Sequence, residues 1–330
     1  MRHQSLHFFF FLALFMFLIM PKTSYCWGFW GHKRINRIAV FTLPSEMLGF
    51  YKKHIEYITN HAVDPDKRRY AVKEEGARHF IDIDHYGKYP FDSLPELWKN
   101  AKTKYTEDTL QAYGINPWYI ETMLYRLTSA FKEGNAINIL RYSADLGHYV
   151  ADAHVPLHTA ENYNGQLTNQ YGIHGLWESR IPELSGEQYD YFVGKARYIE
   201  RPINEAWGFI KVSHAEVDSV LLMEEVLNSE TPEDKKYSIE QKGNSSAKVY
   251  STEYAKEYND RLNNMAERKM RAAILAVGSF WYTAWVNAGQ PDLDKIELKM
   301  SAEELKAAQK EEEKTLKKEN LNFKEKGHIE

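Results

Sequence analysis

Residues 146–178 read LGHYVADAHVPLHTAENYNGQLTNQYGIHGLWE, and this stretch decides the fold that we expect. His148 and Asp152 stand four positions apart in a run with apolar residues at helical spacing, so both side chains leave the same face of a helix. His174 and Glu178 repeat this spacing. The stretch therefore predicts two helical pairs of side chains that can bind a metal ion.

A turn adds a third histidine between these pairs. Pro156 ends the first helix, and His158 follows where the chain can fold back over the first pair. A single histidine is more often an ordinary core or surface residue, but five ligand-type side chains in one stretch favour a metal site. Imidazole and carboxylate ligands suit zinc better than calcium or magnesium, and the lack of thiolates argues against a zinc finger.

The first 26 residues have the layout of a secretory signal peptide. Arg2 precedes a continuous apolar run from Phe8 to Met20, which is short for a membrane span. Cleavage after Cys26 would release Trp27 as the new N-terminus and export the chain, as a periplasmic or secreted protein. The alternative is a lipid anchor on Cys26. Since Cys26 is the only cysteine, the mature chain would contain no disulfide.

From Trp27 to about residue 180, the chain resembles the superfamily of zinc-dependent phospholipases C and S1/P1 nucleases. Those enzymes begin with a tryptophan whose amine and carbonyl oxygen bind one of three zinc ions, and they share the segment H-x3-D-x5-H. Here that segment is His148, Asp152 and His158. The spacing from Trp27 to His32 resembles the nuclease branch. The resemblance implies a single multi-helix, all-α domain built around a cleft with three zinc ions.

The resemblance also implies which residues bind the metal. Site one would contain Asp64, His79, His148 and Asp152. Asp152 would also bridge to a site made by Trp27 and His32. The remaining site would contain His158, His174 and Glu178. The implied ligands are Trp27, His32, Asp64, His79, His148, Asp152, His158, His174 and Glu178.

Two carboxylates near these ligands have further expected roles. Asp64 would act as a ligand, as the catalytic general base, or as both, and Asp66 is its rival in the segment HAVDPDKRR. Asp82 or Asp84 could accept a hydrogen bond from a ligand histidine, since zinc-bound imidazoles usually need such a partner. Asp82 is the expected one, because the resemblance extends over the string HFID.

The resemblance implies hydrolysis of a phosphodiester, a reaction in which clustered zinc ions activate water and offset charge on phosphate oxygens. Glu178, where the nuclease branch typically has Asp, and the short insert between His158 and His174 favour a lipid phosphodiesterase acting on a phospholipid or membrane surface. The Trp27 to His32 spacing favours the alternative, an S1/P1-like nuclease acting on single-stranded nucleic acid. A non-enzymatic zinc-binding protein is the remaining alternative. No obligate protein partner is inferred.

Composition and periodicity indicate how the rest of the chain is organised. The 330 residues carry a net charge of −4, so no global positive field would gather nucleic acid. We expect a catalytic domain over residues 27–290 and a charged helical or disordered tail over residues 291–330, which is rich in lysine and glutamate.

Apolar spacing predicts a mostly helical domain, and no stretch shows persuasive alternation typical of a strand. Residues 230–246 are polar and read as a loop. The expected helical segments are residues 32–58 with a break at Pro44, residues 95–114, 117–133, 135–154 and 187–228, and one long helix over residues 247–286.

Overall fold

The computed structural model describes residues 28–242 and 245–296. This part of the chain is mostly helical, as expected, with one two-stranded antiparallel sheet. The expected leader and most of the expected tail, residues 1–26 and 297–330, lie outside the described residues, as does Trp27. None of the helices within the described ranges is long and apolar enough to cross a lipid bilayer.

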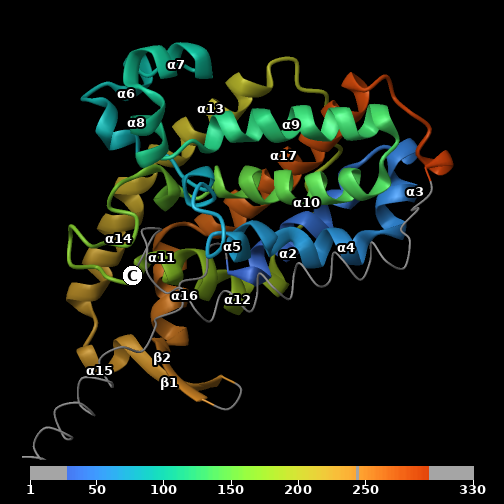
Figure 1. Ribbon diagram of the computed structural model, residues 1–330. Helices are drawn as coiled ribbons and strands as arrows, with labels where there is room; N and C mark the ends of the chain where they lie inside the picture. Colours follow the sequence, from blue (N-terminus) through green and yellow to red (C-terminus); the bar gives the residue numbers. More distant parts are fainter. Residues whose placement is uncertain (1–27, 243–244, 297–330) are drawn as a thin grey trace, which may run out of the picture.

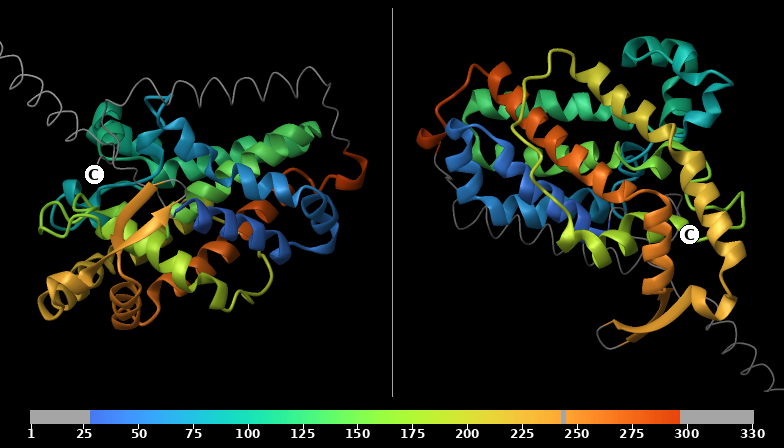
Figure 2. Two further views of the ribbon diagram at one scale, coloured as in Figure 1. Left: turned by 90° about the horizontal axis from the view of Figure 1, so that it is seen from below. Right: turned by 180° about the vertical axis from the view of Figure 1, so that it is seen from behind.

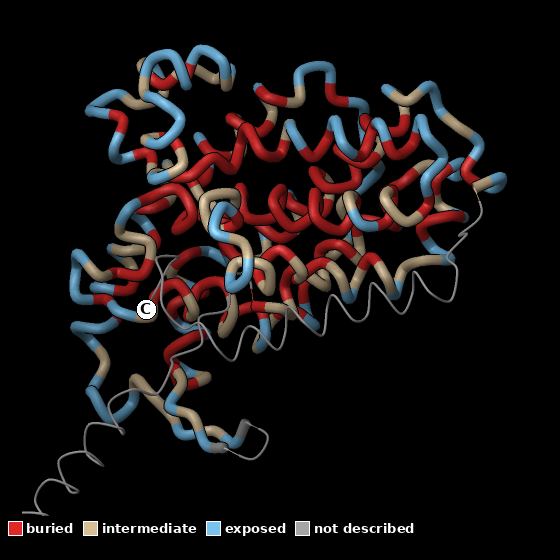
Figure 3. The backbone as a smooth tube through the Cα atoms, viewed as in Figure 1, coloured by how far each residue is buried: buried red, intermediate tan, exposed pale blue. Residues whose placement is uncertain are grey.

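Helix α10 (Ala136–Asp152) lies at the centre of the fold and packs against α9 (Asn116–Glu133), α2 (Phe29–Ala39) and α17 (Met265–Asn287). These helices run side by side in Figure 1, and Figure 3 shows that the chain along α10 is mainly buried. Because α10 is surrounded on several sides, four of its polar residues also lie in the interior, namely Ser143, Asp145, His148 and Asp152.

Local sequence explains how α9 turns into α10. Gly134 has a φ of 61°, a left-handed conformation that glycine adopts without strain, and it closes α9. The side chain of Asn135 then accepts a hydrogen bond from the backbone N–H of Asn138 and caps α10. A tight connection of this kind makes the two helices antiparallel neighbours.

The other helices surround this centre, and the views in Figure 2 show a hairpin projecting from one edge of the helical body. Most of the largest buried side chains are aromatic, among them Trp177, Trp207 and Trp281. The remaining α-helices are α3 (Ser45–Lys53), α4 (Ile55–Asn60), α5 (Asp64–Arg68), α6 (Pro90–Ser93), α7 (Trp98–Tyr105), α8 (Glu107–Ala112), α11 (Ile173–Gly175), α12 (Ile181–Ser185), α13 (Pro202–His214), α14 (Val217–Glu230), α15 (Glu233–Lys236) and α16 (Thr252–Arg261). Short 3-10 segments include η2 (His61–Val63), η3 (Gly76–Arg78), η4 (Ile83–Tyr86) and η5 (Pro156–Thr159), and η6 (Leu176–Arg180) is a π-helix.

The hairpin corrects the expected loop over residues 230–246 and the start of the expected long helix. Strands β1 (Tyr237–Lys242) and β2 (Ser245–Tyr250) pair with Tyr237 opposite Tyr250. The helical part that follows is also divided, because Asn263 and Asn264 both have positive φ between α16 and α17.

Two other helical expectations need correction. The segment 95–114 contains two helices, since Thr106 has a φ of 65° between α7 and α8. The segment 187–228 begins as an extended chain, whose backbone N–H groups at Arg197 and Ile199 donate to the hydroxyls of Ser279 and Thr283 on α17. These side-chain acceptors replace the hydrogen bonds that a helix would supply.

Candidate metal centre

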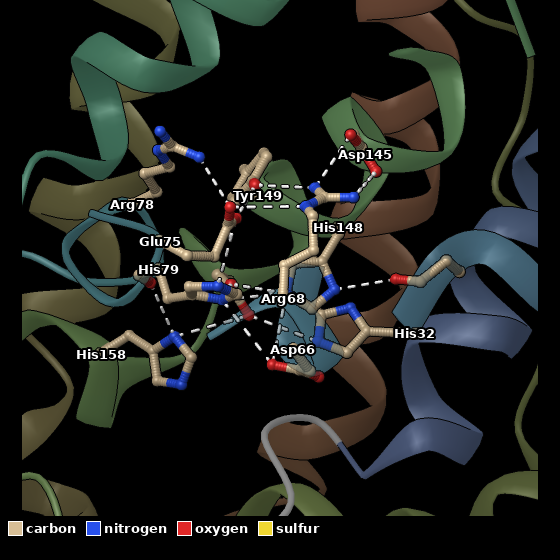
Figure 4. A network of polar contacts seen from close by, with 12 residues as sticks. His32, Asp66, Arg68, Glu75, Arg78, His79, Asp145, His148, Tyr149 and His158 are labelled. Atoms are coloured by element: carbon tan, nitrogen blue, oxygen red, sulfur yellow. Dashed lines mark hydrogen bonds and ion pairs between the residues drawn. The ribbon is translucent and has the colours of Figure 1, made fainter. Parts of the chain in front are cut away.

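Helix α10 presents His148 and Asp152 on one face, as the i,i+4 spacing predicts. Both side chains are fully buried, and Nε2 of His148 lies 3.2 Å from Oδ2 of Asp152. His79 reaches the same carboxylate from the loop after η3, with its Nδ1 2.9 Å from Oδ2 of Asp152 and 3.0 Å from Nε2 of His148. These three residues form one buried group that could hold a metal ion. Figure 4 shows His79 and His148 within this network of polar contacts.

His32 joins this group from α2. Its ring stacks on the ring of His148 with centroids 3.8 Å apart, and its Nε2 lies 3.4 Å from Oδ1 of Asp152. Asp152 therefore faces His79 and His148 with one oxygen and His32 with the other. A carboxylate in this position can bridge two cations.

The structure does not bring Asp64 to these histidines. Its carboxylate lies 2.5 Å from Nδ1 of His61 and 3.0 Å from Nζ of Lys67, and its side chain is 24% exposed. Asp66 lies beside these histidines instead, with Oδ1 3.6 Å from Nε2 of His148 and 3.8 Å from Nδ1 of His79.

The geometry of α5 explains this exchange. Residues two positions apart lie about 200° apart around a helix, so Asp64 and Asp66 leave nearly opposite faces. When Asp66 points into the interior, Asp64 must point toward the surface. Asp66, His32 and His148 form the second buried group that could hold a metal ion.

His158, His174 and Glu178 form the third group, as expected. Nε2 of His158 lies 3.1 Å from Nε2 of His174, and Oε2 of Glu178 lies 2.9 Å from His174 and 3.4 Å from His158. Glu178 belongs to the π-helix η6, a form that is common at functional sites. Nδ1 of His158 is 3.5 Å from Oδ1 of Asp152, so this group adjoins the other two.

Backbone carbonyls fix three of the ligand histidines. The Nδ1 atoms of His148, His158 and His174 donate to the carbonyl oxygens of Ala62, His79 and Tyr163 at 2.8, 3.0 and 3.1 Å. A proton on Nδ1 leaves the lone pair of Nε2 free to bind a metal ion.

Asp82 does not take the place of these carbonyls. Its Oδ1 is buried without a hydrogen-bond partner, and its backbone N–H donates to the carbonyl of Tyr113. Burial, with added repulsion from Asp84 and Glu161, raises the pKa of Asp82 to about 7. The expected hydrogen bond from a ligand histidine to Asp82 is therefore not seen, because the carbonyls of the ligand-bearing loops already hold the rings.

Unsatisfied atoms test whether the residues fit a metal ion. The atoms that are buried without hydrogen-bond partners include both ring nitrogens of His32, both oxygens of Asp66, Oδ1 of Asp152 and both oxygens of Glu178. A buried acceptor without a partner costs free energy, and a cation in each group could bind the acceptor atoms that face it. The nitrogen and oxygen donor set fits zinc.

The electrostatics of the group also favour a cation. Burial alone would raise the pKa of Asp152, but His148 and His158 hold it well below the usual value. Burial would lower the pKa of His148, yet Asp152 and Asp66 raise it to about 9. Without metal, the acidic side chains therefore favour a proton on His148, which a metal ion would displace.

Sequence reasoning missed two charged residues beside the centre. Burial raises the pKa of Asp66 and lowers the pKa of His79. The charge of Arg69 lowers both pKa values, so its guanidinium lies within electrostatic reach of the centre. Glu75 lies behind His79, with Oε1 3.8 Å from Nε2 of the ring. The basic run KRR after Asp66 is the only sequence signal for Arg69, and Glu75 has none.

The N-terminal edge of the described chain lies next to a ligand segment. The backbone N–H of Gly28 donates to Oγ of Ser179 at 3.2 Å, and Ser179 directly follows the candidate ligand Glu178. Gly28 thus begins the described chain beside the third group.

No protein-family model matches this chain, and a search of curated proteins finds no match either.

Proposed function

We propose that this chain is a zinc-dependent phosphodiester hydrolase of the phospholipase C and S1/P1 nuclease type, and that it cleaves phospholipid head groups. The observation that carries the proposal is the meeting of three buried ligand groups around one carboxylate, Asp152. A single structural zinc ion needs only four ligands, so three adjoining groups support a catalytic centre.

The residues present would hold three zinc ions. Asp66, His79, His148 and Asp152 are the proposed ligands of the first site, with Asp66 in the place expected for Asp64. His32 and the second oxygen of Asp152 belong to the site that Trp27 would complete, and the third group is His158, His174 and Glu178. When bound, the ions supply Lewis acidity and lower the pKa of water to about 7.

The side chains of the chain have their own proposed roles in the reaction. Asp66 is a buried acceptor that would take a proton from the attacking water or orient that water. Arg69 would donate to a non-bridging phosphate oxygen, because its charge acts on Asp66, His79 and His158.

Three features support a lipid substrate. Glu178 occupies the last ligand position, where the nuclease branch typically has Asp. Only a short loop connects His158 to His174, whereas the nuclease branch usually has a longer insert there. The net charge of −4 also makes binding of a long polyanion unfavourable away from the centre. The Trp27 to His32 spacing supports the second candidate, cleavage of single-stranded nucleic acid.

Parallel assays with zinc would test the substrate. We expect protein that begins at Trp27 to release phosphorylated head groups from phosphatidylcholine vesicles and to leave single-stranded DNA and RNA intact. His148→Ala should abolish the activity, and Asp64→Asn is the matched control that should keep it. Rapid digestion of nucleic acid without lipid turnover would establish the nuclease instead, and zinc binding with neither activity would indicate a binding protein.

Metal analysis of the same protein would test the centre itself. We expect about three zinc ions per chain. N-terminal sequencing of the processed chain should show Trp27 as the first residue. A residue before Trp27 would turn its α-amine, which is a proposed zinc ligand, into an amide. A stoichiometry of one ion or none would contradict the proposed centre.

A further inference from the structure

Glu75 is a fully buried carboxylate that is held from three sides. The hydroxyl of Tyr149 donates to its Oε1, while Nη1 of Arg78 lies 2.6 Å and Nε of Arg68 lies 3.4 Å from its Oε2. Figure 4 shows Glu75 between these side chains and His79. Two guanidinium groups and a hydroxyl thus supply hydrogen bonds to this buried side chain, as a buried polar group requires.

This carboxylate faces the back of His79. Nδ1 of His79 lies among the ligand atoms, 2.9 Å from Oδ2 of Asp152, whereas Nε2 points the other way and lies 3.8 Å from Oε1 of Glu75. Nδ1 can bind a metal ion only with its lone pair, so the proton of a neutral ring must sit on Nε2. That N–H is buried without a hydrogen-bond partner, and the carboxylate that it faces is Glu75.

His79 differs in this respect from three other ligand histidines. His148, His158 and His174 are fixed by neutral backbone carbonyls. A carboxylate behind an imidazole makes the ring a stronger base and a better ligand than a carbonyl does. The group of His79, His148 and Asp152 therefore has an extra source of metal affinity.

We propose that Glu75 is a positioning residue that selects the tautomer of His79 and strengthens its bond to the metal ion. This inference rests on the proposed metal centre and deepens it. Arg68, Arg78 and Tyr149 serve the same purpose one step further away, because they fix the carboxylate that fixes the ring. A small approach of Oε1 toward Nε2 on metal binding completes the hydrogen bond.

Competition titrations with Zn²⁺ and a chelating dye would test the role of Glu75. In Glu75→Gln, one of the bound ions should lose about 10- to 100-fold in affinity, while the affinities of the others stay unchanged. Glu75→Asp keeps the charge that the two arginines need but withdraws the carboxylate from His79, so it should fold and lose a similar factor. Circular dichroism would confirm that each titrated variant is folded.

Asp145→Asn is the matched control. Asp145 forms an ion pair with Arg68 at 2.9 Å, so this variant weakens the same network without changing a group that faces His79. It should lower the melting temperature and keep the zinc affinity. The proposal is overturned if Glu75→Asp binds every ion as tightly as the wild type, or if Asp145→Asn loses as much affinity as the Glu75 variants.

The outcomes separate this inference from the proposed function. A wild type that binds zinc but cleaves no phosphodiester would refute the function and leave the role of Glu75 standing. A wild type that binds no zinc would refute both. Equal zinc affinity in the wild type and Glu75→Asp, with phosphodiester cleavage intact, would refute the role of Glu75 alone.

Discussion

The side chain of Asn36 fills the space beside Gly147. Nδ2 of Asn36 donates to the carbonyl of Ala144 at 3.0 Å, and a Cβ atom at position 147 would lie 2.1 Å from Oδ1 of Asn36. This contact joins α2 to α10 one residue before His148. The close approach of the two backbones allows the ring of His32 to stack on the ring of His148.

Gly147→Ala should therefore destabilise the protein, although alanine is the better helix former. The added methyl group has to displace a buried, hydrogen-bonded amide, and overpacking of this kind costs about 1–3 kcal/mol. Urea denaturation would measure the loss. Gly208→Ala on α13 is the matched control, because a Cβ there meets no atom within 4 Å and should raise stability slightly. Equal stability of Gly147→Ala and wild type would contradict the close contact.

Asp66→Asn should weaken zinc binding far more than Asp64→Asn. A structural zinc ion gains about 10–16 kcal/mol from four ligands, so loss of one ligand corresponds to a factor on the order of 100. Asp64 contacts His61 and Lys67 near the surface, and its amide variant should keep the affinity of the wild type. Zinc titrations of the two variants would decide between the carboxylates, and the reverse order would restore Asp64 as the ligand.

Asp152→Ala should affect more than one metal ion, because its two oxygens face His79 and His148 on one side and His32 and His158 on the other. We expect zinc to raise the melting temperature of the wild type and to have little effect on the variant, since metal binding contributes folding free energy. Scanning calorimetry with and without zinc would show this. His54→Ala, at the end of α3, is the control that should keep the zinc response. An unchanged response in Asp152→Ala would exclude its bridging role.

The buried carboxyl group of Asp82 predicts a pH dependence. Burial raises its pKa from 3.8 to about 7, so between these values the folded protein keeps a proton that the unfolded chain has lost. The free energy of unfolding should therefore fall as pH rises through this window, by up to about 4 kcal/mol in total. In metal-free protein, Asp82→Asn should be more stable than the wild type at pH 7.5 and equally stable near pH 4.

Urea denaturation at several pH values would test this dependence. Asp92→Asn, an exposed position on α6, is the control and should follow the wild type at every pH. A gain from Asp82→Asn that stays constant across the pH range would mean that the carboxyl group does not titrate as described.

The spacing of apolar residues correctly predicted two long helices and the pairing of side chains four positions apart. The expected helices over residues 117–133 and 135–154 agree with α9 and α10, and the pairs on α10 and near η6 meet as the i,i+4 rule requires. The choice between Asp64 and Asp66 could not be made in this way. It depends on which face of one helical turn, α5, packs toward His148, and five residues carry too little apolar pattern to show that face.

Contacts between distant segments of the chain account for the remaining differences between the predicted and the observed structure. Strands β1 and β2 carry short alternations, with Tyr237 and Ile239 on one and Ala247 and Val249 on the other, which polar neighbours obscure. Glu75 also lacked a sequence signal, because its partner Tyr149 comes from a helix far along the chain. Both features exist only once distant segments have met.

The proposed ligands that the structure describes run along the chain from His32 to Glu178, and this spread has a kinetic consequence. Contacts between such distant residues form only after the loops between them have closed, which is slow and costs chain entropy. No early folding intermediate can offer the complete centre. A zinc ion taken up at full affinity would therefore report that chain folding has finished, and the order of events would be folding first and loading last.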